Sequence, residues 1–222
     1  MRNLKLTKNF FVPGSVFILF FGSIAYSQPT QNQEALDQKV KQFLDQNQSA
    51  WQDMNVPYED GQVLFDLIVK NGYQSALEIG TSTGHSTIWL AWALSKTGGK
   101  LITIDIDQRR LELAKDNLKK VGLLEFVDIR HTDAHHQLVK DLKGTFDFVF
   151  SDADKGWYTQ YFIDLDPKLE IGGCFTAHNV RNSMGGIKKF MEYVRGLDNY
   201  ETTVDKTSSS GISISYKLAS TE

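Results

Sequence analysis

Apolar positions recur along the chain with two different periods, and these periods predict its elements. At residues 31–52 and 60–70 the apolar side chains return every three to four positions, which is typical of amphipathic helices. Short apolar runs then alternate with longer helical stretches, as in an open parallel sheet with helices on both faces. We expect strands at 76–79, 101–105, 126–130, 146–151 and 173–177, and helices at 85–95, 108–121, 135–142 and 158–165.

The end of the chain breaks this alternation. A helical stretch at 184–195 is followed by apolar runs at 200–204 and 212–216, which a polar turn at 208–211 joins. Two strands joined by a short turn form an antiparallel hairpin. The whole pattern predicts an α/β fold, a doubly wound, Rossmann-like and mostly parallel sheet of seven strands with a C-terminal antiparallel hairpin.

The first 27 residues have the layout of a signal peptide. Three basic residues precede an uncharged apolar run from Phe10 to Ala25, which is broken by Gly and Pro and is shorter than the ~20 residues of a membrane-spanning helix. Small residues stand one and three positions before a cut between Ser27 and Gln28. We therefore expect cleavage near Ser27/Gln28 and export to the periplasm or beyond. The alternative is an uncleaved segment that anchors the protein to a membrane.

Residues 28–222 are expected to form one domain, with N-terminal helices at 28–72 and a Rossmann-like core at 73–222. The net charge of the full chain is −3, and loss of the three basic residues before Gln28 lowers it to −6. A mildly acidic protein does not attract phosphate backbones, so nucleic acid is a poor candidate partner. Cys174 is the single cysteine, so the chain cannot form an internal disulfide.

A glycine-containing loop follows the first expected strand and opens a helix. Gly80 and Gly84 stand four residues apart, and no third glycine follows in the register that pyrophosphate binding needs. Glu78, at the strand end, can instead face a cation such as the amino group of a methionine moiety. Asp105 ends the next strand, where a carboxylate can accept hydrogen bonds from both ribose hydroxyls. A strand-to-helix turn that binds nothing is the alternative interpretation.

Several motifs, in this order, resemble those of class I S-adenosylmethionine-dependent methyltransferases, and in particular of the catechol and caffeoyl-CoA O-methyltransferases. The resemblance extends from Trp51 to Tyr216. It is carried by Met54-Asn55-Val56 with Gly61-Gln62, and by ALEIGTSTGHST, LITIDID, FDFVFSDADK and Tyr193-Val194-Arg195-Gly196.

The resemblance implies a fold, a cofactor and a set of residues that contact it. The cofactor is S-adenosylmethionine, and Asp133 is expected beside its adenine. A pair of histidines at 135–136 is equally typical of a solvated helix start. The implied cofactor-binding residues are Val56, Glu78, Gly80, Ser82, Ser86, Asp105, Ile106, Asp133, Ala134, His135 and Asp152.

The same resemblance implies the catalytic group. Asp152-Ala153-Asp154-Lys155 follows the strand at 146–151, so these side chains leave the carboxyl edge of the sheet, where ligands bind. In the family the first Asp of this motif ligates a divalent cation and the Lys takes the hydroxyl proton of the substrate. We carry these roles to Asp152 and Lys155, with His178 and Asn179 as the further expected metal ligands.

His178 is the main departure from the family, which has Asp-Asn where this chain has His178-Asn179. An imidazole makes a metal site softer and favours Zn, Mn or Fe over Mg. Three interpretations stay open: an altered metal, a weakly held Mg²⁺, or no metal with His178 as the base.

The expected acceptor is a small phenolic or catechol-like compound. The acidic residue with which catechol methyltransferases hold the second hydroxyl has no convincing match, Asp205 being the one candidate. Trp51, Trp157, Tyr158 and Met184 can line an aromatic pocket, although aromatic side chains at such positions more often belong to the core. Two other functions remain open: a metal-independent methyltransferase for another small acceptor, and a non-catalytic exported protein that binds S-adenosylmethionine or a nucleoside. The resemblance is also compatible with a homodimer.

Overall fold

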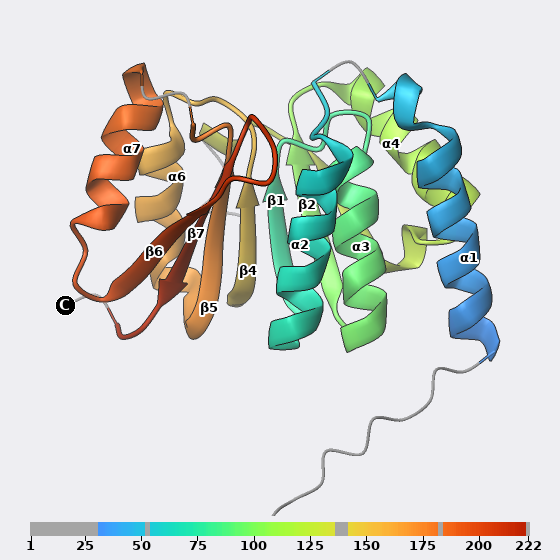
Figure 1. Cartoon of the computed structure of the whole chain (residues 1–222), viewed down its shortest axis with the longest axis horizontal. Helices are drawn as coiled ribbons and strands as arrows, with labels where there is room; N and C mark the ends of the chain where they lie inside the picture. The colour runs from blue at the N-terminus through green and yellow to red at the C-terminus, as the bar shows by residue number, and fades with distance from the viewer. Residues whose placement is uncertain (1–30, 52–53, 136–141, 182–183, 221–222) are drawn as a thin grey trace, which may run out of the picture.

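A computed structural model describes residues 31–51, 54–135, 142–181 and 184–220 as a sheet covered by helices on both faces (Figure 1). The expected signal peptide lies outside these residues, and so does most of the helix expected at 135–142. Among the described residues, the structure contains no helix that is long and apolar enough to cross a membrane.

The elements follow the predicted alternation. The helices are α1 (Gln31–Gln46), α2 (Tyr58–Asn71), α3 (His85–Thr97), α4 (Gln108–Val121), α6 (Tyr158–Leu165) and α7 (Gly185–Arg195). The strands are β1 (Ser75–Ile79), β2 (Lys100–Asp105), β3 (Val127–His131), β4 (Phe146–Ser151), β5 (Leu169–His178), β6 (Tyr200–Asp205) and β7 (Ile212–Lys217).

The strands form one sheet in the order β3-β2-β1-β4-β5-β7-β6. All neighbours from β3 to β5 are parallel, whereas β7 runs antiparallel to both β5 and β6. The strand order reverses between β1 and β4, so the loops after these two strands diverge to opposite sides. Such a switch point is where open α/β sheets bind ligands.

Two layers of helices protect the sheet. On one face α6 and α7 pack against β1, β4 and β5 through a cluster that includes Phe162, Phe175 and Phe190. On the other face α2 and α3 pack against the same strands through Leu64, Leu90 and other side chains. The amphipathic helix α1 lies outside this second layer and contacts α3 and α4 (Figure 1). With both faces buried, the strands carry nearly continuous apolar runs.

The predicted fold class is confirmed, and the differences concern element ends. The first helix ends at Gln46 instead of residue 52, because Asn47 turns its side chain back onto the carbonyl of Phe43 and a short 3-10 turn follows. The fifth strand begins at Leu169, four residues before the predicted start. Residues 170–172 of this strand are exposed, and Gly172 and Gly173 interrupt the apolar run, so the apolar pattern did not reveal the start of the strand.

Candidate active site

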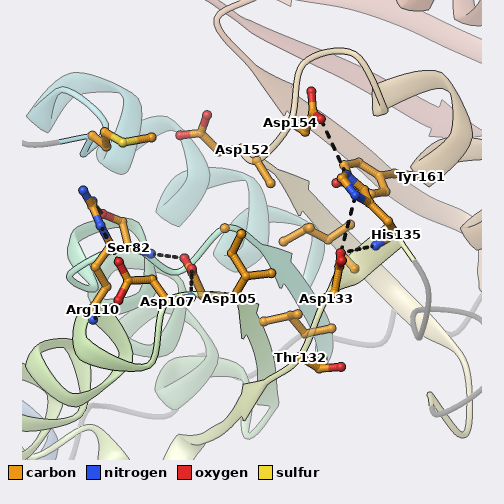
Figure 2. A pocket seen from close by; sticks show the side chains of 17 residues that line it. Ser82, Asp105, Asp107, Arg110, Thr132, Asp133, His135, Asp152, Asp154 and Tyr161 are labelled. Carbon is orange, nitrogen blue, oxygen red and sulfur yellow. Dashed lines mark hydrogen bonds and ion pairs between the residues drawn. The ribbon is translucent and has the colours of Figure 1, made fainter.

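A cavity of about 420 Å³ opens at the carboxyl edge of the sheet (Figure 2). Its wall combines residues after β1, β2, β3 and β4, the four strands that meet around the switch point. Its size falls within the range of small-molecule sites. The lining residues with polar side chains are Ser82, Asp105, Asp107, Arg110, Thr132, Asp133, His135, Asp152, Asp154 and Tyr161.

Asp105 is held at the end of β2 by two backbone donors. Its Oδ2 accepts a hydrogen bond from the amide of Ser82 at 2.8 Å, and its Oδ1 accepts one from the amide of Asp107 at 2.9 Å. Each carboxylate oxygen can accept more than one hydrogen bond. The carboxylate is thus fixed in orientation and still able to receive a pair of ligand hydroxyls.

At Gly80 the loop after β1 packs closely against the backbone of the loop after β4. Gly80 has φ of 101°, and a Cβ at this position would lie 2.6 Å from the carbonyl oxygen of Asp152. Only glycine accommodates both the positive φ and this contact. The glycine that the sequence pattern singled out is therefore required by close packing between two strands' loops.

A cluster of aromatic and acidic side chains lines the side of the cavity near β3. His135 lies between two carboxylates, 3.5 Å from Asp133 and 3.6 Å from Asp154, as Figure 2 shows. Its ring stacks on Trp157 with centroids 4.1 Å apart, and Tyr161 lies beside it at 5.8 Å. Flat side chains and hydrogen-bonding groups at one end of a cavity suit a planar heterocycle.

Glu78 lies behind the cavity wall and is fully buried. Its Oε1 accepts a hydrogen bond from Ser86 at 2.5 Å, and its Oε2 accepts from Thr87 and Thr103, each at 2.6 Å. Burial raises the pKa of Glu78 to about 7, although the three hydroxyl donors oppose this shift. The carboxyl thus braces the end of β1 and the start of α3.

The Met54–Val56 segment is attached to α3 through His85. Trp89 Nε1 donates to His85 Nε2 at 3.3 Å, so the other nitrogen, Nδ1, carries the proton and bonds the carbonyl of Val56 at 2.9 Å. Burial lowers the pKa of His85 to about 4, which keeps this ring neutral. Met54 itself is exposed and lines the cavity.

Most of the predicted cofactor-binding residues are brought together at the cavity. The cavity is lined by Gly80, Ser82, Asp105, Ile106, Asp133, Ala134, His135 and Asp152. The three that do not line it are Val56, Glu78 and Ser86, all buried behind its wall. Their direct contact with a cofactor stays a prediction.

A second set of polar side chains extends from Asp152 into the interior of the protein. Lys155 Nζ donates to Asp152 Oδ1 at 2.5 Å, and the other oxygen of Asp152 lies 3.1 Å from His178 Nδ1. The second ring nitrogen of His178, Nε2, lies 2.7 Å from Oδ2 of Asp60 at the start of α2. The three predicted catalytic residues therefore form one hydrogen-bonded chain, with Asp60 at its inner end.

The inner end of this chain is buried. Asp60 has no exposed surface and also accepts a hydrogen bond at 2.8 Å from Ser208, in the loop between β6 and β7. Burial lowers the pKa of His178, but the hydrogen bonds and charges of Asp152 and Asp60 outweigh it and raise this pKa to about 9. The ring is therefore held between two negative charges.

The divalent metal expected at Asp152, His178 and Asn179 does not fit this arrangement. Both oxygens of Asp152 are engaged, one by the Lys155 ammonium and one by His178, and both nitrogens of His178 face carboxylates. The two carboxylates are already balanced by an ammonium and an imidazolium, so a divalent ion would add uncompensated positive charge. Among the residues described, no group of three His, Cys, Asp or Glu side chains has metal-ligating geometry.

The residues expected to line an aromatic acceptor pocket do not form one wall. Tyr158 is fully buried in the core under α7 and donates to the backbone carbonyl of His178 at 3.2 Å. Trp51 stacks on His85 in a different cluster, and Met184 is exposed. Asp205, the candidate for holding a second hydroxyl, accepts a hydrogen bond from the amide of Thr207 in its own turn.

Several residues of the site were missed by the sequence analysis, among them Asp60, Ser208 and Arg110. Asp60 precedes Leu64 and Ile68 by four and eight positions, so it shares their apolar face, and a carboxylate on such a face was a usable signal. Arg110 lines the cavity and donates to Ser82 at 2.9 Å. Nothing in the serine-rich turn distinguished Ser208 from its neighbours.

The chain is similar to known O-methyltransferases in both sequence and fold. A family model described as O-methyltransferase matches residues 26–184. A protein named catechol O-methyltransferase, from Niastella koreensis, is 45% identical over 110 residues, which cover 48% of this chain and 49% of the relative. Caffeoyl-CoA O-methyltransferase 2 of Eucalyptus globulus is 32% identical over 157 residues, or 65% of this chain and 63% of the relative.

The chain thus spans about half to two thirds of the length of the curated relatives it matches. Among solved structures, the O-methyltransferase of Bacillus cereus in complex with SAH superposes with a TM-score of 0.70 at 27% identity, covering 82% of this chain and 91% of that chain. The resemblance inferred from the sequence motifs is confirmed, and the chain belongs to the O-methyltransferase family.

Proposed function

We propose that the cavity binds S-adenosylmethionine and that the protein transfers its methyl group to a hydroxyl of a small phenolic or catechol-like acceptor. The observation that carries this proposal is that Asp152 connects the cavity with the hydrogen-bonded chain of charged side chains. This residue lines the cavity and also begins the chain to Lys155 and His178. A methyl donor in the cavity would therefore lie next to groups able to bind and deprotonate a hydroxyl.

The polar residues of the cavity suit the parts of this cofactor. Asp105 offers a preorganised carboxylate to the ribose hydroxyls, and the stacked ring of His135 with Tyr161 offers flat surfaces to the adenine. The Bacillus cereus structure, which contains SAH, supports the same assignment. The names of the Niastella and Eucalyptus relatives support a phenolic acceptor.

A non-catalytic nucleoside-binding protein is the rival from a different class. It requires the cavity but has no use for the chain of charged groups behind it. Burying Asp60 beside His178 costs stability because removing two charges from water is unfavourable, and a catalytic function would account for keeping the pair. The buried pair therefore favours an enzyme over a binding protein.

Calorimetric titration of S-adenosylmethionine into the purified protein tests the cofactor. Methyl transfer is then measured by mass spectrometry with catechol, a caffeoyl ester and singly methylated catechols as acceptors. We expect micromolar binding and equal amounts of methyl ether and S-adenosylhomocysteine. Failure to bind the cofactor would rule out the proposal, and binding without transfer to any hydroxyl would favour the binding protein.

We also propose that the N-terminal segment directs export, with cleavage near Ser27/Gln28, and that the mature protein can form a homodimer. Mass spectrometry of the protein from its native cell, after fractionation, tests the first point. Retention of Met1 would contradict cleavage. Light scattering of the purified protein tests the second point.

A further inference from the structure

We infer that Arg110 is a positioning residue of the cofactor site, because it holds the amide of Ser82 against the carboxylate that would bind the ribose. The inference rests on the proposed binding of S-adenosylmethionine and adds a residue to it. It starts from a closed ring of contacts among four residues that line the cavity and lie together in Figure 2: Ser82, Asp105, Asp107 and Arg110.

The ring passes through both oxygens of Asp105. Its Oδ2 accepts a hydrogen bond from the amide of Ser82 at 2.8 Å, and its Oδ1 accepts one from the amide of Asp107 at 2.9 Å. Arg110 closes the ring, because its Nη1 donates to Ser82 Oγ at 2.9 Å and its Nε lies 3.4 Å from Asp107 Oδ2. The guanidinium thus connects the loop after β1 with the start of α4, although Ser82 and Arg110 are 28 residues apart.

The start of α4 fixes the position of Arg110. Asp107 is the N-cap of this helix, and its Oδ1 accepts a hydrogen bond from the amide of Arg110 at 3.1 Å. The carboxylate of Asp107 therefore bonds the backbone of Arg110 and also faces its guanidinium. Because such a cap holds the first turn of a helix in place, the side chain of Arg110 starts from a fixed point beside the loop.

Ser82 is the part of the ring that needs support. Its φ is 48°, in the left-handed region, which is unfavourable for a residue with a Cβ, and the direction of its amide depends on this conformation. The residues on either side are held separately. Thr81 is bonded to Thr103 at 2.5 Å, and the carbonyl of Thr83 accepts from Asn117 at 3.1 Å. We therefore expect loss of the guanidinium to release the Ser82 amide without unfolding the loop.

The arrangement leaves the charge of Asp105 available to a ligand. The guanidinium of Arg110 faces Asp107, and within the described ranges Asp105 forms no ion pair. Both donors to Asp105 are neutral backbone amides. Its oxygens can each accept a further hydrogen bond, and bonds from hydroxyls to an ionised acceptor are stronger than those to a neutral one. Arg110 thus orients the group that would bind the ribose without competing for it.

Arg110→Met tests the inference, with Arg109→Met as the matched control. Methionine keeps an apolar stem but cannot donate to Ser82. Arg109 precedes Arg110 on the same helix and is exposed, and its substitution removes the same charge. We expect calorimetry to show that Arg110→Met binds S-adenosylhomocysteine about 10-fold more weakly, the effect of one hydrogen bond from a charged group. Arg109→Met should bind within about twofold of the native value, and kcat at saturating cofactor should stay within about threefold in both variants.

A double-mutant cycle separates this role from a general effect on stability. Ser82→Ala removes the hydroxyl that Arg110 bonds, and we expect it to weaken binding about 10-fold as well. If the two residues act through one bond, the double variant should bind at most about threefold more weakly than either single variant. A native Kd in either single variant, or a loss of about 100-fold in the double variant, would overturn the inference.

Hydrogen exchange of the Ser82 amide tests the positioning without any ligand. In ¹⁵N-labelled free protein we expect this amide to exchange about 10-fold faster or more in Arg110→Met, and at the native rate in Arg109→Met. Unchanged exchange in Arg110→Met would overturn the inference. If exchange behaves as expected but the native protein does not bind S-adenosylhomocysteine, the proposed function fails while the role of Arg110 in the ring stands.

Discussion

The cofactor side and the acceptor side of the site are built in different ways. On the cofactor side, Asp105 is held by backbone amides that lie at short separations in the chain, those of Ser82, 23 residues away, and of Asp107, two residues away. On the acceptor side, Asp60 meets His178 across 118 residues and Ser208 across 148. The cofactor side is therefore a local motif with backbone donors. The acceptor side consists of side chains that come into contact only in the complete fold.

Because of this difference, the two sides tolerate different kinds of substitution. Backbone donors stay in place when most neighbouring side chains change, so the loops keep the geometry of the cofactor side in such variants. A buried chain of side chains depends on every member, because a missing partner leaves a polar group without a hydrogen bond. Variants on the two sides should therefore affect different measured quantities.

His178→Gln should have the largest effect. It removes the positively charged ring that Asp60 and Asp152 hold beside the proposed acceptor position. We expect kcat to fall by about 1,000-fold while the cofactor Kd stays within threefold. Time courses of product formation by mass spectrometry at saturating substrates give kcat, and calorimetry gives Kd. A variant that loses cofactor binding to the same extent would show that the two sides are not separable.

Gly80→Ala should damage both sides at once, because Gly80 lies where they touch. Its positive φ and the 2.6 Å approach to the Asp152 carbonyl leave no room for a Cβ. We expect a loss of roughly 3 kcal/mol in the free energy of unfolding, the sum of backbone strain and overpacking. Urea denaturation measures it, and Gly144→Ala, with positive φ but no close neighbour, controls for the strain alone.

Asp105→Asn should change the cofactor side alone. The amide has one acceptor oxygen instead of two and no charge, so we expect cofactor binding about 50-fold weaker, equivalent to one charged hydrogen bond. At saturating cofactor, kcat should remain within threefold of the native value. The exposed Asp128→Asn serves as control. A large fall in kcat at saturation would contradict the separation of the two sides.

Glu78 should make a smaller contribution that depends on pH. Burial raises its pKa from 4.5 to about 7, so the folded protein binds this proton more tightly than the unfolded chain does. The stabilisation is complete below pH 4.5 and is lost as the pH rises through 7. Between pH 5 and pH 8, the difference in unfolding free energy between native protein and Glu78→Gln should change by about 2 kcal/mol. A constant difference would show that Glu78 has an ordinary pKa.

The same contrast explains what the sequence could predict. The period of apolar residues predicted the sheet and the hairpin, since each element buries a face of its own. Gly80 and Asp105 were found because their roles depend on strand ends and loops, which local pattern reveals. His178 was recognised as a departure, but its partners were not identified, because no local pattern links residue 60 with residue 208. The metal site expected at Asp152, His178 and Asn179 took no account of these partners.

The bond between Ser208 and Asp60 joins a helix that precedes the first strand to the loop between the last two strands. Every described residue that lines the cavity comes before residue 162, so this part of the site is synthesised well before Ser208. A nascent chain can assemble the cavity first, whereas His178 obtains its complete surroundings only when the final hairpin has emerged from the ribosome. Under the proposed function, the part of the site that would hold the methyl donor is therefore synthesised before the part that would use it.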